Sequence, residues 1–520
     1  MNRNIVNRVS VGDILTRGAS IVPDKPAVIY KGEVWAYKQL EQASTNMAKN
    51  LLDICQQGDT VAILSRNNIA LIVSYFACAK AGLLCAPMNL GLKATNLVHC
   101  IKHSKAKILI GSDDLLEEIR EVDNKITRQL HVYKIEDEAI DVKNDDEIPS
   151  YSVLLKENIR SLENIIIGDR DPVQLLYTSG TTSEPKGVVT SHLAVTLAGL
   201  TNALCYHYDH NVVTLSVLPL YHCAALNCFA IPTLLLSGTL IITNGFEVNE
   251  VLESIDRYNV TNFVFLPMMY SEIIEKTQKT KKQYKSVKDA IYAMAPMPKT
   301  WLENIHNIFP NALVVLSSGQ SEYTPAACIQ REEEQWSKAE SWGKATALTQ
   351  IAIMREDGRL AEPGQSGEIV YRGPLVMSGY WLNTEATEKN YKNGWYRSGD
   401  IGWIDEENTV WFSDRKKDVI KSGGENVSSV VVERCLMAHP DVETAAVIGV
   451  QDEKWGEAVT AYIIPRAKES LTEYEINIWA KKHLARYEVP KRYVFVDELP
   501  MTATGKIQKA QLRKAMKKSM

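Results

Sequence analysis

The stretch LLYTSGTTSEPKG, residues 175–187, decides how this chain is interpreted. It begins as a short apolar segment typical of a strand, continues into a loop rich in glycine, serine and threonine, and reaches Lys186 near its end. Small residues let backbone N–H groups approach a polyphosphate, hydroxyl groups donate to its oxygens, and a lysine neutralises its charge. The spacing of glycine and lysine is not that of a Walker A loop. Taken alone, the stretch fits a phosphate-binding loop and a polar surface loop equally well.

The length allows several domains, and the composition is ordinary for a globular soluble protein. Of the 520 residues 45% are hydrophobic and 23% charged, and the net charge of −5 gives no reason to expect binding to nucleic acid or to an anionic membrane. The 9 cysteines are scattered without a CxxC pair, which favours buried thiols in a reducing compartment. No signal peptide is evident, and the apolar segment 228–242 is too short and interrupted to span a bilayer. We therefore expect a cytoplasmic protein without a transmembrane segment.

Short apolar runs alternate with segments of helical periodicity along the chain. TVAIL (60–64) and AKILIG (106–111) are typical of buried strands, and IALIVSYFACAKAG (69–82) has helical spacing and ends at a glycine. Further strand-like runs are VVTLSVLP (212–219), TLIIT (239–243), NFVFLP (262–267) and ALVVLS (312–317). This alternation predicts an α/β fold with mostly parallel sheets. The charged runs at 136–147 and 276–288 are interpreted as solvated loops or helix faces.

A change of pattern near residues 413–418 predicts a domain boundary. Short strands with turns, GEIVYRG (367–373) and TVWFSD (409–414), precede it, and helical and strand patterns alternate after it as in a small α+β unit. We predict a large N-terminal domain of residues 1–415, with α/β subdomains and a β-barrel-like part. A small, mobile α+β lid domain of residues 416–520 follows.

Several motifs in a fixed order connect the chain to a family. They are YTSGTTSEPKG (177–187), PLYHCAAL (219–226), SGQSEYTP (318–325), YRSGDIGWID (396–405), DRKKDVIKSGGENV (414–427) and LPMTATGKIQK (499–509). With them the chain resembles the adenylate-forming superfamily of acyl-CoA synthetases, peptide-synthetase adenylation domains and luciferases, over nearly its whole length. The resemblance implies that a carboxylate attacks the α-phosphorus of ATP, giving an acyl-adenylate and pyrophosphate, and that a thiol then displaces AMP. It implies ATP, Mg²⁺ and coenzyme A as cofactors.

The resemblance also assigns roles to residues that match the motifs. The nucleotide-binding positions are Thr178, Ser179, Gly180, Thr181, Thr182, Lys186, Gly319, Gln320, Ser321, Asp400, Arg415 and Lys506. Among these, Asp400 accepts hydrogen bonds from both ribose hydroxyls and Arg415 lies near ribose and phosphate. Thr182 and Glu322 hold Mg²⁺, which prefers hard oxygen ligands. The catalytic set is Lys506, Glu322, His222 and Thr182, in which Lys506 bridges the carboxylate and the α-phosphate.

Further positions concern the second half-reaction and the acid. The resemblance implies that Lys417 is the hinge about which the small domain rotates, and that Ser422, Gly423 and Gly424 then face the thiol. The substrate pocket is predicted from His222, Met268, Met294 and Ala295. Outside their motifs these residues have simpler interpretations: Glu322 as a surface carboxylate, Asp400 as a turn residue, Arg415 and Lys506 as solvated charges, and His222 as a structural histidine.

Three positions depart from the commonest family pattern. Ser183 stands where the phosphate loop usually has glycine, and Ser318 stands where an aromatic residue usually stacks on adenine. The segment 293–296, Ala-Met-Ala-Pro, replaces a Gly-Gly-Ala-Pro turn, so that Met294 adds apolar bulk. These changes affect the expected shape of the pocket and leave the charged positions filled.

The acid and the acceptor are only partly indicated. The segment after His222 carries no acidic residue that could meet an ammonium group, and the runs FLPMMY (265–270) and AMAPMP (293–298) are apolar, which favours a fatty or aryl acid. Coenzyme A is the expected acceptor, and the phosphopantetheine arm of a separate carrier protein is the alternative. A non-catalytic nucleotide- or acyl-binding relative, which would bind ATP without releasing pyrophosphate, is the third hypothesis. The oligomeric state stays open, with a homodimer as one option.

Overall fold

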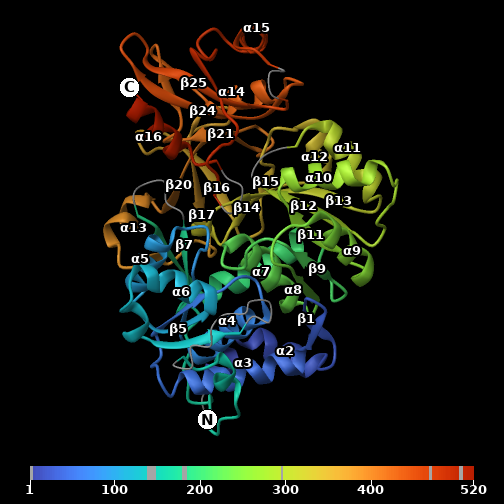
Figure 1. Ribbon diagram of the computed structural model, residues 1–520, viewed down its shortest axis with the longest axis vertical. Coiled ribbons are helices and arrows are strands. Elements are labelled where there is room, and N and C mark those ends of the chain that lie inside the picture. The colour runs from blue at the N-terminus through green and yellow to red at the C-terminus, as the bar shows by residue number, and fades with distance from the viewer. Residues whose placement is uncertain are drawn as a thin grey trace. The chain divides into compact units, whose positions relative to one another are not determined.

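The computed structural model describes residues 4–136, 148–178, 184–293, 297–467, 471–502 and 507–519 (Figure 1). The chain forms two compact units. The first contains residues 1–350 and 371–396, and the second contains residues 351–370 and 397–520. The chain therefore passes between the units three times, within β16 (Gln350–Met354), β17 (Gly367–Arg372) and β20 (Trp395–Ile404). The predicted domain boundary between residues 415 and 416 stays a prediction.

One sheet of the first unit has 7 strands in the order β18-β8-β7-β4-β3-β5-β6. Strands β3 to β7 pair in parallel, and β8 and β18 continue the sheet in antiparallel pairing. All residues of β3 are buried, as expected for the centre of a sheet that is covered on both faces. The strands are β3 (Thr60–Leu64), β4 (Leu84–Pro87), β5 (Ala106–Ser112), β6 (His131–Ile135), β7 (Pro172–Thr178), β8 (Lys186–Ser191) and β18 (Gly379–Tyr380).

The other sheet of the first unit has 9 strands in the order β15-β14-β13-β12-β11-β9-β10-β1-β2. Its inner strands are parallel, and β2, β14 and β15 pair antiparallel at the two edges. The predicted apolar runs become its central strands. The strands are β1 (Pro26–Tyr30), β2 (Glu33–Ala36), β9 (Val213–Ser216), β10 (Thr239–Ile242), β11 (Asn262–Phe265), β12 (Asp289–Ala293), β13 (Leu313–Gly319), β14 (Ala326–Gln330) and β15 (Lys344–Ala345).

A layer of helices separates these sheets. Successive contacts run in the order α4-α3-α2-α8-α7, and members of this layer contact strands of both sheets. Helix α4 is buried along its whole length; the Asn68 side chain accepts a hydrogen bond from the N–H of Leu71 at its start, and Gly82 ends it with a left-handed φ of 66°. The layer consists of α2 (Asp13–Ile21), α3 (Tyr37–Leu51), α4 (Ile69–Ala81), α7 (His192–Cys205) and α8 (Ile231–Leu235).

Other helices cover the outer sheet faces (Figure 1). Helices α5 and α6 contact β5 and β6, while α9, α11 and α12 contact β9 and β13. The bounds are α5 (Ala94–His103), α6 (Asp113–Val122), α9 (Val248–Tyr258), α10 (Pro267–Gln278), α11 (Lys299–Ile308) and α12 (Glu332–Ser337). The remaining short elements of this unit are α1 (Asn4–Asn7), η1 (Ile126–Arg128), η2 (Tyr151–Leu155), η3 (Ala224–Ala230), η4 (Ser321–Tyr323), α13 (Thr384–Asn390) and β19 (Tyr391–Lys392).

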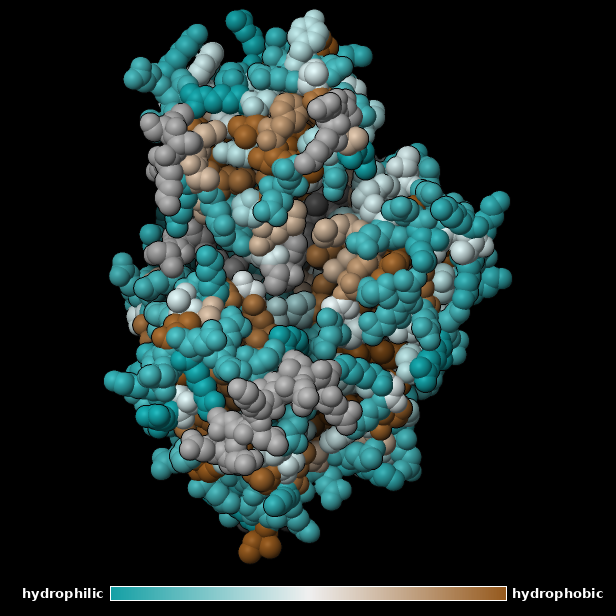
Figure 2. Space-filling model, in the orientation of Figure 1, coloured by the Kyte–Doolittle hydropathy of each residue, from teal (hydrophilic) through white to brown (hydrophobic). Residues whose placement is uncertain are grey.

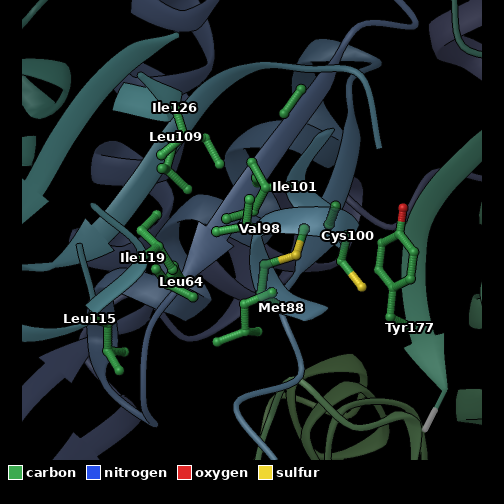
Figure 3. Close-up of a cluster of buried hydrophobic side chains, with 14 of the residues drawn as sticks. Leu64, Met88, Val98, Cys100, Ile101, Leu109, Leu115, Ile119, Ile126 and Tyr177 are labelled. Carbon is green, nitrogen blue, oxygen red and sulfur yellow. The ribbon is translucent and has the colours of Figure 1, made fainter. Parts of the chain in front are cut away.

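A hydrophobic cluster under the seven-stranded sheet supports the strand that leads into the glycine-rich loop. In Figure 3 the ring of Tyr177 lies beside Cys100 at one end of this cluster. The Tyr177 hydroxyl is 2.9 Å from Nδ1 of His103, so the last buried residue of β7 has a fixed polar contact. Burial of a single Leu or Ile side chain contributes about 1.5–3 kcal/mol. The cluster therefore anchors β7 one residue before Thr178.

The second unit holds an antiparallel-rich sheet with a core on each face. Along β24, Ala445 and Val447 contribute to one core, while Ala446 and Ile448 contribute to the other, as strand alternation requires. Its elements are β22 (Ile420–Ser422), β23 (Glu425–Val427), α14 (Ser429–Met437), β24 (Val442–Asp452), β25 (Gly456–Pro465), α15 (Glu473–His483), β26 (Arg492–Phe495) and α16 (Lys509–Ser519). A further sheet has the order β16-β17-β20-β19, with β21 beside β20; β16 is Gln350–Met354 and β21 is Val410–Arg415.

The predicted α/β class, with a large N-terminal body and a small C-terminal domain, is confirmed. The run NFVFLP is shorter as a strand than predicted, because β11 ends at Phe265 and Pro267 opens α10, a position where proline is tolerated. No helix in the described ranges is long and apolar enough to cross a membrane. The face in Figure 2 is largely hydrophilic, with smaller apolar areas.

Candidate active site

The glycine-rich loop connects two antiparallel strands. Thr178 ends β7, Lys186 begins β8, and the two residues are paired across the strands. The Thr178 hydroxyl lies 3.4 Å from the Lys186 carbonyl oxygen, to which it donates. The predicted phosphate-binding residues between them, Ser179, Gly180, Thr181 and Thr182, and also Ser183, lie outside the described residues. The structure thus places the two ends of the predicted loop side by side.

Tyr380 connects Lys186 to Glu322. It lies in β18, which pairs with β8, and the Lys186 ammonium group is 4.9 Å from the centre of its ring. The Tyr380 hydroxyl donates to Oε1 of Glu322 at 2.9 Å. Burial, together with the negative charge of Glu322, raises the pKa of Tyr380, so the phenol stays neutral and remains a donor. A cation and a carboxylate from distant parts of the chain are therefore oriented by one aromatic side chain.

The segment around Glu322 is a tight turn at the end of β13. The backbone N–H of Gln320 donates to the Pro325 carbonyl, and a Cβ atom at Gly319 would lie 1.6 Å from that carbonyl oxygen. The Gln320 Oε1 accepts from the Tyr396 hydroxyl at 3.2 Å, whereas its buried Nε2 finds no partner within the described residues. Ser318 is buried in β13 opposite Cys328. An unpaired buried donor beside a carboxylate suits a polar ligand.

The residues after His222 form an unusual helix. His222 Nδ1 accepts from the N–H of Ala224, and the next residue, Cys223, has its sulfur 3.0 Å from the Ser321 hydroxyl. Burial raises the pKa of Cys223 to about 12, so its thiol stays protonated. Residues Ala224–Ala230 are a π-helix, a feature frequent at functional sites. On it, the fully buried Asn227 has neither side-chain amide atom hydrogen-bonded within the described part of the chain.

For the other predicted pocket residues, the structure does not test a contact with the acid. Met268 is the second residue of α10 and is 50% exposed. Met294 and Ala295 belong to 294–296, outside the described residues. Their predicted contacts with the acid stay predictions.

In the second unit, Asp400 and Arg415 form an ion pair. They are paired on β20 and β21, and Arg415 Nε lies 2.7 Å from Asp400 Oδ1. The Asp400 side chain is only 3% exposed, whereas that of Arg415 is 32% exposed. Gly399 precedes Asp400 with a φ of 75°, a conformation that favours glycine, which explains the Ser-Gly-Asp sequence. A buried carboxylate is thus held with one arginine beside it.

The local hairpin structure explains why glycines occupy the predicted thiol-side positions 423 and 424. Ser422 pairs with Glu425 across β22 and β23, and Gly423 and Gly424 between them have φ values of 63° and 89°. Two successive left-handed residues are what a two-residue hairpin requires. The Ser422 hydroxyl is buried without a hydrogen-bond partner among the described residues. The predicted role of these residues toward a thiol stays a prediction.

The predicted hinge adjoins the helix that follows the catalytic-lysine motif. Lys417 is exposed, and its neighbour Asp418 pairs with Arg513 of α16 at 2.8 Å. Lys509, at the start of α16, pairs with Glu433 at 2.7 Å. Residues 503–506, which include Lys506, lie outside the described residues, and Met501 and Ile507 on either side of them form an antiparallel bridge.

Sequence reasoning missed three residues that shape the site. Tyr380 links Lys186 to Glu322, Asn227 is a buried amide that has no side-chain hydrogen-bond partner among the described residues, and Glu368 contacts the backbone next to Asp400. Two features of the sequence could have indicated the first two of these residues: Tyr380 lies in the short motif SGYW (378–381), and Asn227 is a polar residue within an apolar run.

Each unit by itself offers groups that suit part of a magnesium nucleotide. In the first unit, Glu322 offers a carboxylate with one oxygen already hydrogen-bonded, and Gln320 offers a buried donor without a partner among the described residues. In the second unit, Asp400 offers a buried carboxylate of the kind that accepts from a cis-diol. No side chain in this set is of the soft type that would instead select a transition metal.

Comparisons with known proteins agree with this geometry. Residues 15–381 match the family model of the AMP-binding enzyme, and residues 431–506 match that of the AMP-binding enzyme C-terminal domain. A feruloyl-CoA synthase of Amycolatopsis sp is 31% identical over 97% of this chain and 98% of its own length, and a 2-succinylbenzoate–CoA ligase of Bacillus subtilis is 30% identical over 97% and 98%. The structure of O-succinylbenzoate coenzyme A synthetase from Bacillus subtilis, in complex with ATP and magnesium ion, superposes with a TM-score of 0.84 at 27% identity and covers 96% of this chain and 99% of that one. The chain belongs to the AMP-binding enzyme family, in its acyl-CoA synthetase branch.

Proposed function

We propose that the protein is an ATP-dependent acid–CoA ligase for a carboxylic acid with an apolar, fatty or aryl body. It converts the acid to an acyl-adenylate with release of pyrophosphate and then transfers the acyl group to coenzyme A. The observation that supports this proposal is the contact chain Lys186–Tyr380–Glu322, in which the residue that follows the glycine-rich loop and the predicted magnesium ligand contact the same tyrosine. Transfer to the phosphopantetheine arm of a carrier protein is the alternative for the second step.

In the first step the carboxylate must approach the phosphates of ATP although both are anions, and the proposed residues supply positive charge and hold the reactants in position. Lys186, held over the Tyr380 ring, supplies positive charge at the phosphates, and Asp400 fixes the ribose. Glu322 and Thr182 would hold Mg²⁺, which neutralises phosphate charge and aligns the phosphates when bound. Lys506 contributes a point charge between the carboxylate and the α-phosphate. The protein therefore acts by positioning and charge stabilisation, with no covalent intermediate on a side chain.

The acid is expected to carry an apolar body. The relatives include enzymes named for feruloyl, trans-cinnamate and 2-succinylbenzoate substrates, all of which contain an aromatic ring. In this chain the π-helix is apolar apart from Asn227, so a mainly apolar acid could satisfy one polar contact there. This combination supports an aryl acid with a hydrogen-bonding substituent.

A panel of acids tests the proposed function. We expect at least one fatty or aryl acid to support carboxylate-dependent exchange of labelled pyrophosphate into ATP, followed by thioester formation with coenzyme A detected by mass spectrometry. Coenzyme A is compared with holo-carrier proteins in the same assay. Absence of exchange with every acid, alongside measurable ATP binding, would support the non-catalytic alternative and contradict the proposal.

Replacing Asn227 with leucine is expected to change which acids are preferred. Because one hydrogen bond contributes about 0.5–1.5 kcal/mol, the ratio of kcat/KM for a ring-hydroxylated acid to that for its unsubstituted analogue should fall up to about tenfold. Steady-state kinetics on 4-hydroxycinnamate and cinnamate measure this ratio. The melting temperature serves as the control, since removal of an unpaired buried amide should not destabilise the fold. An unchanged ratio would show that Asn227 does not face the acid.

A further inference from the structure

Glu368 collects contacts from both segments that carry the predicted ribose-binding residues. It lies in β17, and its side chain is only 7% exposed. We propose that Glu368 is a positioning residue that keeps Asp400 available for the ribose hydroxyls of ATP. The inference rests on the proposed function, because the role of Asp400 toward ribose is part of it.

The first set of contacts involves the strand that precedes Asp400. The backbone N–H of Gly399 donates to Glu368 Oε1 at 3.1 Å, and Arg397 donates to Glu368 Oε2 through Nε at 3.0 Å and through a terminal nitrogen at 2.5 Å. Gly399 has a left-handed backbone that fixes the direction of Asp400. The carboxylate thus holds the residue immediately before Asp400.

The second set involves the residue immediately after Arg415. The Lys416 ammonium group donates to Glu368 Oε2 at 3.1 Å, and the Lys416 backbone N–H donates to the Gly399 carbonyl at 2.9 Å. Glu368 therefore connects the two segments at the point where Asp400 and Arg415 are paired. One carboxylate fixes the relative position of both predicted ribose residues.

The distribution of charge gives Glu368 a second effect. Three cationic side chains, Arg397, Arg415 and Lys416, surround two buried carboxylates, Glu368 and Asp400. Glu368 pairs with Arg397 and Lys416, which leaves Arg415 as the cation beside Asp400. Without Glu368, Arg397, three residues before Asp400, and Lys416, the residue after Arg415, would lose their carboxylate partner. Glu368 therefore also neutralises two of the three cations that lie close in sequence to Asp400 and Arg415.

Comparing ATP with a nucleotide that lacks the ribose hydroxyls distinguishes this positioning role from a general structural role. In Glu368→Ala we expect kcat/KM for ATP in pyrophosphate exchange to fall by about tenfold to a hundredfold. A fall of this size corresponds to the loss of charge-assisted hydrogen bonds to the ribose. The kcat/KM for 2′,3′-dideoxy-ATP should change by less than about threefold, because this substrate makes no hydrogen bond to Asp400. The preference for ATP over the dideoxy analogue should therefore collapse. An equal loss with both nucleotides would overturn the inference.

Matched variants keep the outcome interpretable. Asp452→Ala removes another carboxylate of the second unit, which accepts from backbone N–H groups of Lys454 and Trp455 and pairs with Arg492; it should leave the ATP preference unchanged. Asp400→Ala should abolish the preference by itself, and its failure to do so would contradict the proposed role of Asp400 independently of Glu368. If Glu368→Ala does not fold, Glu368→Gln, which keeps one acceptor oxygen, should lower the preference in the same direction. An unchanged preference in a folded Glu368→Gln would also overturn the inference.

Discussion

Replacing Lys506 with alanine is expected to abolish carboxylate-dependent pyrophosphate exchange. Removal of one group that stabilises developing charge in a transition state costs about a hundredfold to a thousandfold in rate, and Lys506 is predicted to contact both reacting anions. Thioester formation from a chemically prepared acyl-adenylate should be retained, because the lysine is not required once the adenylate exists. Parallel assays of the two half-reactions measure this difference.

The control is Lys514→Ala, which removes an exposed lysine of α16. This variant should keep both half-reactions at the rate of the unaltered protein. If Lys506→Ala instead lowered both half-reactions equally, the lysine would have a structural role, and the assignment of the LPMTATGKIQK motif to adenylation would be wrong.

Replacing Gly319 with alanine is expected to have the largest effect on the folded site. The added Cβ would lie 1.6 Å from the Pro325 carbonyl oxygen, a backbone atom that can move only with the whole turn. Overpacking of this kind costs about 3 kcal/mol or more when backbone must shift. Because the same turn carries Gln320 and Glu322, we expect a lower melting temperature. We also expect ATP to bind about tenfold more weakly or worse, because hydrogen bonds to the nucleotide are lost. Differential scanning fluorimetry with and without ATP measures both effects.

A second glycine provides the comparison. Gly58, also in the first unit, has a left-handed φ of 85° and open space around its Cβ position, so Gly58→Asn should be tolerated. Equal melting temperatures and equal ATP binding in Gly319→Ala and the unaltered protein would contradict the close approach of Gly319 to Pro325.

Secondary-structure elements could be predicted from the sequence where a local pattern of residues determines them. TVAIL became β3 and IALIVSYFACAKAG became α4, because a fully buried strand and a capped apolar helix both have recognisable periodicity and end signals. Strand direction did not follow: β8 returns antiparallel to β7 across the glycine-rich loop, and periodicity alone does not specify direction. The two adjacent glycines at 423 and 424 were interpreted through a ligand, whereas the hairpin geometry also requires them.

Motifs in the sequence indicated residues of the predicted site, whereas the residues that hold them in position were identified only in the structure. Thr178, Lys186, Glu322, Asp400 and Arg415 were indicated by motifs, and the structure adds the contacts that orient them. Tyr380 and Glu368 act through tertiary contacts with residues distant in sequence, and no local pattern distinguishes such a tyrosine or glutamate from others. The ligand-facing role of each residue remains a prediction that the variants test.

The central claim, that the carboxylate of the acid attacks the α-phosphorus of ATP, is tested most directly by following an oxygen atom. The acid that supports exchange is prepared with heavy oxygen in its carboxylate and converted to the thioester in unlabelled water. Mass spectrometry of the products should find one heavy oxygen in AMP and pyrophosphate without label, because the attacking oxygen leaves with AMP when the thiol displaces it. Label in inorganic phosphate with formation of ADP, or AMP without label, would contradict the account.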